Sequence, residues 1–365
     1  MSISPLRRFS LWLSAGMRSA LAWGGDWIWA RPGIARWIYP TTAETREEDY
    51  RVHNGAMFAG FHEQERMLAD RPRMAFYAAA IARMIRPGDR VIDLGTGTGI
   101  LAALAARHGA AHVYALDHSE ILTHAQALAV ANRVENVEFV ATHSTAFTPA
   151  EKVDVILHEQ MGDCLFDESM VANVADLRDR VLKPGGRIVP SDFEFYCEPV
   201  MVRDSRVVPF IWELEVQGYD YSSLERHRPQ NPGYYHLAST DAGLVDHFLG
   251  DPAPALTIDL HTVNPEGLPA ELVIRRTVIE AGRLDGLAVF FRARVGDDLS
   301  LSTNPLDPRR APHWGFRLLR TDRQVFAVGD EIEIRLSVER WTELSSWRWS
   351  CVRQRGASPL ADVAV

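Results

Sequence analysis

Four carboxylates lie close together in one short stretch of the chain. Glu159, Asp163, Asp167 and Glu168 follow a short apolar run at residues 153–157. Apolar runs that end in a polar loop are typical of central strands in a parallel sheet, whose carboxyl ends hold ligands. Acids at this density repel one another unless a cation lies among them. The stretch therefore predicts a site for a cationic group, and the alternative is a solvated acidic loop.

A glycine-rich loop precedes this acidic stretch. An apolar run at residues 91–94 leads into GTGTG (95–99) and an alanine-rich segment, and a second apolar run at 113–116 ends at Asp117. Glycines let the backbone approach a ligand where a side chain would clash, and the N-terminus of the following helix favours polar or anionic groups. Asp117 is placed to accept hydrogen bonds from two ribose hydroxyls. The order strand, glycine loop, helix, strand and acid predicts a nucleoside-binding site.

The spacing within the glycine loop separates cofactor classes. Asp93, Gly95 and Gly97 form D-x-G-x-G-x-G together with residue 99, whereas dinucleotide folds usually carry G-x-G-x-x-G for a pyrophosphate. No basic residue stands between positions 91 and 104. The pattern resembles that of class I S-adenosylmethionine-dependent methyltransferases, whose loop passes under a cofactor without phosphates. The resemblance implies S-adenosyl-L-methionine as the cofactor, and a dehydrogenase is the alternative that the spacing disfavours.

Two periodicities divide the chain around these motifs. Between residues 46 and 190, helical spacing of apolar residues alternates with short apolar runs, which predicts an α/β Rossmann-like domain. Residues 191–365 predict an antiparallel β-barrel-like substrate domain, and the irregular stretch 210–237 is interpreted as an inserted arm. The period-two alternation of this second domain recurs at 256–263, 271–279, 287–295, 331–339 and 347–352.

Residues 1–45 form a separate N-terminal extension in our interpretation. Five tryptophans and five arginines lie in the first forty residues, with Asp26 as the one acid. We expect the extension to pack on its own domain. A lid over the ligand site and a membrane-surface segment are the alternatives, the membrane contact being disfavoured. A cleaved signal peptide is also disfavoured because Arg18 interrupts the apolar run.

Composition limits the class of function. The chain has 365 residues, 47% hydrophobic, and a net charge of −9, which argues against nucleic-acid binding and suits a cationic substrate. Cys164, Cys197 and Cys351 are too scattered for a disulfide framework or a zinc site. No His/Cys cluster or calcium-loop pattern is present, so we expect no metal. A reducing, cytoplasmic location fits best.

Several separate motifs resemble those of the protein arginine methyltransferases. HEQMGDCLFDESM (158–170) resembles their double-glutamate loop, and VIDLGTGTGIL (91–101) resembles their cofactor loop. LSTNPLDPRRAPHW (301–314) resembles the loop that ends in their Thr-His-Trp signature, with Pro312 in place of threonine. GYDYSSL (218–224) resembles the entry into their dimerisation arm. The resemblance covers roughly residues 47–353 and implies N-methylation of a guanidino group and a homodimer formed through the arm.

The resemblance also implies a role for each matching residue. Glu159 and Glu168 would clamp the guanidinium of the acceptor, and Asp70 and His313 would form a pair beside it. Arg73 would pair with the cofactor carboxylate, and Asp117 would hold the ribose. The remaining candidates are Asp93, Gly95 and Gly97 for the shape of the cofactor loop, His143 and Ser144 near the adenine, and Met67 and Trp314 for the acceptor pocket.

The chemistry gives independent reasons for the two glutamates. A guanidinium stays protonated at neutral pH, its lone pairs are delocalised, and it must approach a cationic sulfonium. Two opposed carboxylates neutralise the site and hold the planar fork bidentately. In-line placement then supplies much of the acceleration. A proton must leave with or after methyl transfer, either to Glu168 or to the pair Asp70 and His313.

The sequence departs from the family pattern near the acceptor. Gln160 replaces a tryptophan, and Asp163 and Asp167 replace aromatic residues. Phe58 lacks an expected hydroxyl, and Gln64 stands where histidine is usual. More acids and fewer aromatic walls suggest a substrate with an additional cationic group. We hypothesise that Asp163 or Asp167 receives the α-amino group of a free amino acid or a basic side chain of a peptide.

Three hypotheses for the function therefore remain open at this stage. Free arginine and arginine in a peptide or protein both suit the two glutamates. Another cationic small molecule of a biosynthetic pathway is the second hypothesis. A catalytically silent S-adenosylmethionine-binding subunit is the third, and the retained Glu159, Glu168, Arg73 and His313 disfavour it.

Overall fold

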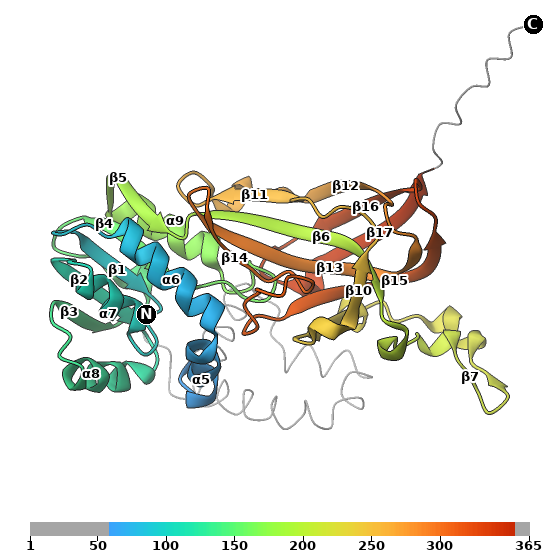
Figure 1. Ribbon diagram of the computed structural model, residues 1–365, viewed down its shortest axis with the longest axis horizontal. Coiled ribbons are helices and arrows are strands. Elements are labelled where there is room, and N and C mark those ends of the chain that lie inside the picture. The colour runs from blue at the N-terminus through green and yellow to red at the C-terminus, as the bar shows by residue number, and fades with distance from the viewer. Residues whose placement is uncertain (1–57, 355–365) are drawn as a thin grey trace, which may run out of the picture. The chain divides into compact units, whose positions relative to one another are not determined.

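The computed structural model describes residues 58–354, and the predictions for residues 1–45 lie outside this range. From Gln64 onward the described residues belong to one compact unit. This unit contains a parallel sheet with its helices and an antiparallel β-domain (Figure 1). Within residues 58–354 no helix has the length and apolarity needed to cross a membrane.

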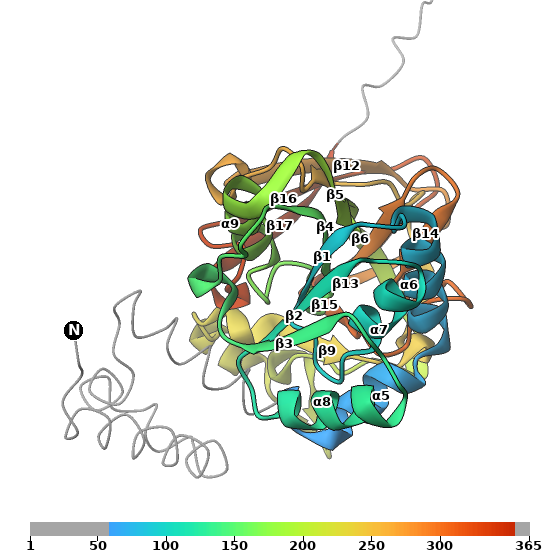
Figure 2. The ribbon, with the colours of Figure 1, turned by 90° about the vertical axis from the view of Figure 1, so that its left-hand side faces the viewer.

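The parallel sheet confirms the Rossmann-like prediction. Its strand order is β3-β2-β1-β4-β5, and every pair in it is parallel. Figure 2 shows the helices on both sides of these strands. The strands are β1 (Arg90–Leu94), β2 (His112–Asp117), β3 (Val137–Ala141), β4 (Val153–His158) and β5 (Leu182–Val189). The helices are α5 (Phe61–Ala69), α6 (Arg71–Met84), α7 (Ile100–Arg107), α8 (Ile121–Ala131) and α9 (Met170–Val181).

Two helices, α5 and α6, precede the sheet, because the helical chain is interrupted at Asp70. The Asp70 side chain accepts a hydrogen bond from the backbone N–H of Arg73 at 2.9 Å, which caps the first turn of α6. Pro72 occupies a first-turn position, where the missing N–H costs nothing. The cap fixes the start of α6 and thereby the position of Arg73.

The antiparallel part begins at Asp192, directly after the last parallel strand. A seven-stranded sheet has the central order β10-β6-β13-β15-β9, with β11 paired to β6 and β14 paired to β13. A second sheet has the order β12-β16-β17. The strands are β6 (Asp192–Val202), β9 (His236–Ser239), β10 (Val245–Phe248), β11 (Leu256–Asp259), β12 (Glu271–Thr277), β13 (Gly282–Val295), β14 (Leu299–Ser302), β15 (Phe316–Phe326), β16 (Glu331–Val338) and β17 (Trp347–Gln354).

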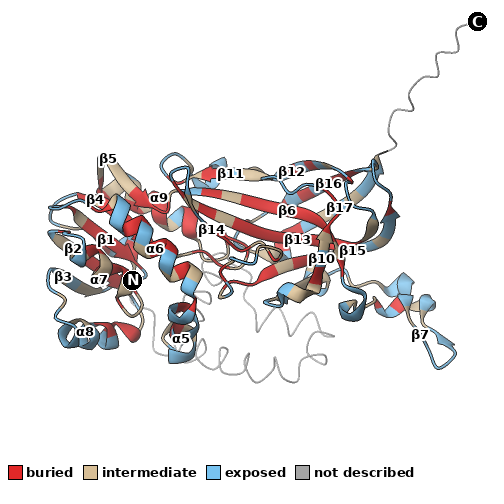
Figure 3. Ribbon diagram, in the orientation of Figure 1, coloured by how far each residue is buried: buried red, intermediate tan, exposed pale blue. Residues whose placement is uncertain are grey.

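The predicted period-two segments correspond to strands β11, β12, β13, β16 and β17. Strands β6 and β13 are buried along nearly their whole length, as the red ribbon of Figure 3 shows. Side chains from both sheets and from the parallel sheet join one hydrophobic core. The ladders form two antiparallel sheets, so the fold is an antiparallel domain packed beside the Rossmann-like sheet.

The segment interpreted as an arm contains short elements and one small hairpin. The hairpin strands β7 (Glu215–Val216) and β8 (Tyr219–Asp220) are exposed (Figure 1). Rings of Phe210, Trp212, Tyr234 and Tyr235 pack together at the base of the segment. The 3-10 helices are η3 (Ile211–Glu213), η4 (Ser222–His227) and η5 (Pro232–Tyr235), and β9 returns the chain to the large sheet.

Candidate active site

The glycine loop and the acidic loop leave adjacent strands at the same edge of the parallel sheet. Leu94, the last residue of β1, pairs with Leu116 of β2 and with His158 of β4. Gly95, Asp117 and Glu159 therefore follow one another across the carboxyl edge of three neighbouring strands. This is the edge at which open α/β sheets bind ligands.

The glycine loop adopts a conformation that favours glycine. Gly95 has φ +72° and Gly97 has φ +54°. A Cβ at Gly97 would lie 3.0 Å from the Gln64 side chain. The backbone N–H of Gly97 donates to Asp117 Oδ2 at 3.0 Å, so the second strand's acid lies against the loop. The other Asp117 oxygen accepts from the backbone and the hydroxyl of Ser119.

Asp93 is fully buried and holds the glycine loop through two hydrogen bonds. It accepts hydrogen bonds from the Thr96 hydroxyl at 2.6 Å and from the Ala102 backbone at 3.0 Å. Burial raises the pKa of Asp93 to about 6, and the nearby carboxylates of Asp117 and Glu159 add to this effect. Asp93 therefore connects the loop to α7 and makes no surface that a ligand could touch.

His143 and Ser144 follow β3, the strand next to β2. The His143 ring pairs with the Thr145 hydroxyl at 2.9 Å and lies 5.7 Å from the ring of His118, centroid to centroid. Ser144 is buried, and its carbonyl accepts from Arg180. His118 directly follows Asp117 at the end of β2 and is a further candidate for the nucleoside edge. The sequence analysis did not single it out, although its place after Asp117 could have drawn notice.

Arg73 and Glu159 form an ion pair between α6 and the acidic loop. Arg73 Nη2 lies 2.9 Å from Glu159 Oε2, and the two side chains are only 5% and 12% exposed. Arg73 Nη1 also donates to the carbonyl of Met67 at 2.9 Å. Burial alone would lower the pKa of Arg73, but the Glu159 carboxylate more than offsets it and the pKa is raised. A partly buried ion pair thus stands beside the glycine loop.

Tyr77 marks the space that the two glutamates share. Its buried hydroxyl donates to the carbonyl of His158 at 3.0 Å. Burial raises the pKa of Tyr77 well above its usual value, and the carboxylates of Glu159 and Glu168 both raise it further. Both glutamates therefore lie within electrostatic reach of one phenol at the foot of the acidic loop. Tyr77 lies on the buried face of α6, and the sequence analysis did not single it out.

Asp70 and His313, which were predicted to form a pair beside the acceptor, meet through the backbone of His313. Asp70 Oδ2 accepts from the backbone N–H of His313 at 2.8 Å, while Asp70 Oδ1 caps α6. Burial, with the positive charges of Arg73 and Arg66, lowers the pKa of the His313 ring to about 3. An imidazole with that pKa does not retain a proton near neutral pH. Asp70 thus joins α6 to the loop before β15, and the ring is a poor base.

Asp163 and Asp167, which were hypothesised to receive a substrate cation, have partners within the protein. Asp163 Oδ2 pairs with Arg317 Nη2 of β15 at 3.0 Å, and Asp163 Oδ1 accepts from the Gly315 backbone at 2.9 Å. Asp167 accepts from the backbone N–H of Cys164 at 3.2 Å. Burial and the charge of Asp163 raise the pKa of Asp167, and the charge of Arg317 offsets part of this rise. The cation that these acids require is a residue of the chain itself.

Trp314 braces the acidic loop and does not line an open pocket. The side chain is 3% exposed, and its indole N–H donates to the Met161 carbonyl at 2.5 Å. Trp314, which was predicted to bind substrate, therefore has its ring enclosed by protein. Met67 is also buried, on the face of α5 that carries Gln64. Its carbonyl, which Arg73 binds, ties it to the ion pair.

Two contacts at the acidic loop had no signal in the sequence. Arg317 follows the His-Trp motif by three residues, and nothing in its spacing distinguishes it from other strand arginines. Gln160 accepts a hydrogen bond from Asn173 at 3.1 Å, and its amide lies 3.8 Å from the place of a Cβ at Gly95. Both residues link the loop to elements that are distant in the sequence.

Comparison with known proteins agrees with this geometry. A family model described as a methyltransferase domain matches residues 85–218. The chain is 30% identical over 318 residues to protein arginine N-methyltransferase PRMT10 of Oryza sativa subsp. japonica, covering 78% of this chain and 83% of that protein. It is 37% identical over 316 residues to protein arginine N-methyltransferase 6 of Danio rerio, covering 84% and 88%.

The chain belongs to the protein arginine N-methyltransferase family. A solved structure of protein arginine methyltransferase 10 from Arabidopsis thaliana matches it with a TM-score of 0.70 and 25% identity, over 83% of this chain and 96% of that chain. The fold predicted from the sequence is confirmed by this match. Family membership makes this arginine methyltransferase an S-adenosylmethionine-dependent enzyme.

The residues of this arginine methyltransferase fit S-adenosylmethionine. The glycine loop presents backbone without side chains, and Asp117 lies against it with a carboxylate suited to ribose hydroxyls. The Nε of Arg73 is buried without an acceptor among the described residues, which suits a further carboxylate. The absence of a basic residue in the loop suits a cofactor without phosphates. Within residues 58–354 no group of His, Cys, Asp and Glu has the arrangement of a metal site.

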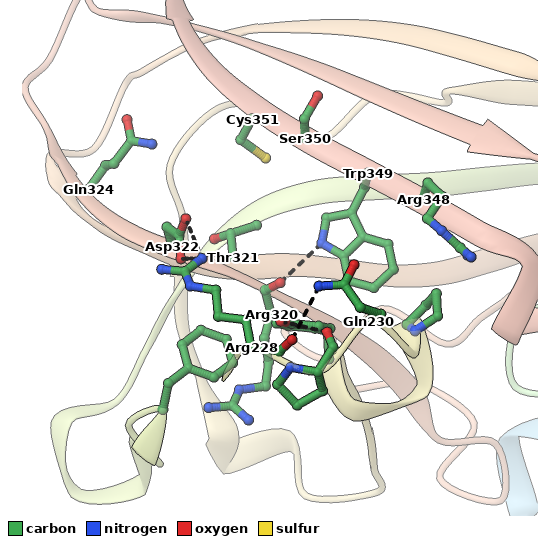
Figure 4. A pocket seen from close by; sticks show the side chains of 14 residues that line it. Arg228, Gln230, Arg320, Thr321, Asp322, Gln324, Arg348, Trp349, Ser350 and Cys351 are labelled. Atoms are coloured by element: carbon green, nitrogen blue, oxygen red, sulfur yellow. Dashed lines mark hydrogen bonds and ion pairs between the residues drawn. The ribbon is translucent and has the colours of Figure 1, made fainter. Parts of the chain in front are cut away.

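A cavity of about 450 Å³ lies away from these residues, between the arm and strands β15 and β17 (Figure 4). Arg228, Arg320 and Trp349 are among its lining residues. None of the candidate site residues of the arginine methyltransferase lines it. The cavity is therefore separate from the carboxyl edge at which the glycine and acidic loops meet.

Proposed function

We propose that this arginine methyltransferase acts on an arginine side chain within a protein or peptide, held between Glu159 and Glu168. The observation that carries the proposal is the position of the acidic loop at the sheet edge next to the glycine loop. Both glutamates act on the same buried phenol, Tyr77, which supports a shared site. A planar cation between two carboxylates is the arrangement that a guanidinium requires.

The bound cofactor supplies a methyl group on a sulfonium centre. Two positive groups then face each other, and the carboxylates of Glu159 and Glu168 offset their repulsion. Glu159 also pairs with Arg73, so its orientation is set before the acceptor enters. Preorganised charge of this kind costs no reorganisation during the reaction. The chain thus fixes the acceptor nitrogen in line with the methyl group.

The acceptor nitrogen must lose a proton with or after transfer. The pKa of the His313 ring is lowered to about 3, so it does not keep a proton at neutral pH. We assign proton acceptance to Glu168 for this reason. Asp70 is engaged by two backbone N–H groups and takes a positioning role.

The acceptor class follows from the loss of a site for an α-amino group. Asp163 is paired with Arg317 and with the backbone of Gly315, and Asp167 closes its own loop. Asp163 therefore already has a cation as its partner, and Asp167 is used within the loop, which supports an acceptor without an α-amino group. The curated relatives are named for acting on protein arginine, which supports the same acceptor.

The decisive experiment compares acceptors with labelled S-adenosylmethionine and the full chain. The acceptors are free L-arginine, an arginine peptide, the same peptide with lysine, and a panel of small cations. We expect methylarginine in the arginine peptide and at least about tenfold slower transfer to free arginine. Faster transfer to free arginine or to another small cation would contradict the proposed acceptor. Cofactor binding without transfer to any acceptor would indicate a silent subunit.

We also propose that two copies associate through residues 210–237 and that the protein works in the cytoplasm. Exposed Tyr219 and Val216 on the hairpin offer apolar surface for a second copy. All three cysteines are free, which suits a reducing compartment. Light scattering of the full chain and of a Tyr219→Ser/Val216→Ser variant tests the association. A monomeric wild-type protein would refute the proposed dimer. Fractionation of cells tests the proposed cytoplasmic location.

A further inference from the structure

Arg317 lies between the acidic loop and the antiparallel domain. We propose that Arg317 is a positioning residue for methyl transfer, which holds the loop so that Glu168 faces the acceptor. The inference rests on the proposed function of the two glutamates. It assigns to a strand residue of the antiparallel domain a role in the geometry of the Rossmann-like site.

Contacts among its own residues hold the conformation of the acidic loop. It runs from the end of β4 to the start of α9, and Leu165 and Ser169 adopt φ +73° and +58°. Asp167 lies across Gly162, where a Cβ would come within 2.1 Å of Asp167 Oδ1. Asp167 also accepts from the Cys164 backbone. These contacts shape the loop but do not tie it to the rest of the molecule.

Three polar contacts tie the loop to the antiparallel domain, beside the packing of Phe166 against Phe195 and Trp341. The indole of Trp314 donates to the carbonyl of Met161, and Asp163 accepts from the backbone of Gly315 while it pairs with Arg317. A Cβ at position 315 would lie 3.0 Å from the Ser239 carbonyl and 3.3 Å from Asp163, so the close approach favours glycine there. The side chains of Arg317 and Asp163 are 24% and 29% exposed, and the pair is shielded in part from solvent.

The charges of the loop make this tether necessary. Asp163 and Asp167 lie four residues apart in this loop, and Asp167 directly precedes Glu168. Burial and the charge of Asp163 raise the pKa of Asp167, and the charge of Arg317, which pairs with Asp163, offsets part of this rise. Without this guanidinium, Asp163 and Asp167 would repel one another across a short loop. Because Glu168 follows Asp167 in the chain, a shift of Asp167 would displace it.

The cofactor side does not depend on Arg317. The glycine loop is held by Asp93 and Asp117, and Arg73 is held by Glu159 and the Met67 carbonyl. The loss of Arg317 should therefore affect the acceptor and leave the cofactor in place. This split distinguishes a positioning residue from a residue that only stabilises the fold.

The test compares Arg317→Met, Arg317→Lys, Asp163→Asn and the double variant Asp163→Asn/Arg317→Met with the full chain. Asparagine keeps an oxygen for the Gly315 N–H, so Asp163→Asn removes the charge alone. The matched control is Arg83→Met, which breaks another ion pair between the two parts, Arg83 with Asp298 at 2.6 Å. Calorimetry measures binding of S-adenosylhomocysteine, and steady-state kinetics with the arginine peptide give kcat and KM.

We expect Arg317→Met to lower kcat/KM for the peptide by about 10²-fold, because small displacements of a reacting group cost this much. Cofactor affinity should stay within about twofold. Arg317→Lys should recover most of the activity, and the double variant should be no worse than the poorer single variant. A loss in the double variant equal to the product of the single losses would overturn the proposal.

Hydrogen exchange gives a measure that does not depend on turnover. Amides of residues 159–169 should exchange faster in Arg317→Met and at the wild-type rate in Arg83→Met. Equal exchange in the two variants would also overturn the proposal. A wild-type protein that methylates no arginine would refute the proposed function, while the exchange of the loop would still decide whether Arg317 positions it.

Discussion

Arg73 and Glu159 join helix α6 to the loop after β4 through a contact of 2.9 Å, and both side chains are nearly enclosed. The pair places a positive group between the glycine loop and the site proposed for the acceptor. Glu159 is therefore held by a buried partner on another element. Its removal should affect both the proposed substrate site and the stability of the fold.

Glu159→Gln and Glu168→Gln should separate these effects. Each variant should lose about 10²-fold or more in kcat/KM, because each removes a charge that faces the reaction. Glu159→Gln should also lower the free energy of unfolding by about 3 kcal/mol, because it leaves the Arg73 guanidinium buried without its partner. Exposed Glu135→Gln is the control. A Glu159→Gln variant as stable as Glu135→Gln in urea unfolding would contradict this expectation.

Asp163→Asn should slow methyl transfer without changing the preference among acceptors. Its carboxylate contacts Arg317 and Gly315, so the substitution alters the loop and removes no group that binds an α-amino group. The ratio of kcat/KM for the arginine peptide to that for free arginine should stay within about twofold of the wild-type ratio. A selective loss for free arginine would restore the hypothesis that Asp163 binds the substrate.

Trp314→Phe should destabilise the protein through the carbonyl of Met161. That carbonyl would lose its indole donor in a buried site, which costs about 1–3 kcal/mol. Trp349→Phe is a matched control, since the Trp349 indole donates to the Arg320 carbonyl at a more exposed position. Thermal unfolding should show a smaller loss for the control. A Trp314→Phe variant as stable as the control would show that the indole contact contributes little.

His158 should make stability depend on pH between about 4 and 6.5. The ring is fully buried and bonds the Pro190 carbonyl, and burial lowers its pKa from 6.5 to about 4. Below pH 6.5 the ring binds a proton in the unfolded chain but stays neutral in the folded state. The free energy of unfolding therefore falls as the pH drops. From pH 6.5 to pH 5 this amounts to about 2 kcal/mol.

Urea unfolding of His158→Gln checks this expectation. The difference in unfolding free energy between pH 6.5 and pH 5 should be smaller in the variant than in the wild type by about that amount. Exposed His261→Gln should retain the wild-type dependence. Identical pH dependence in all three proteins would mean that the charge of His158 is accommodated in the fold.

Local patterns in the sequence determined the fold class and the position of the site edge. The GTGTG loop between two apolar runs and the acid Asp117 are short-range features, and the sheet places them where parallel strands end. Period-two alternation found strands such as β16 because one of their faces meets solvent. Strand β6 has almost no exposed face, and its acids Glu194 and Glu198 pair with arginines of β13 and β12, so polarity did not mark a solvent side.

Only the tertiary structure decided which charges meet. The sequence indicated that four crowded acids require a cation, but it could not show that Arg73 and Arg317, respectively 86 and 154 positions away from their acids, supply it. It suggested Asp70 and His313 as a pair but not that the contact runs through a backbone N–H. Ion pairs across distant segments depend on how helices and sheets pack, and no local spacing records that packing.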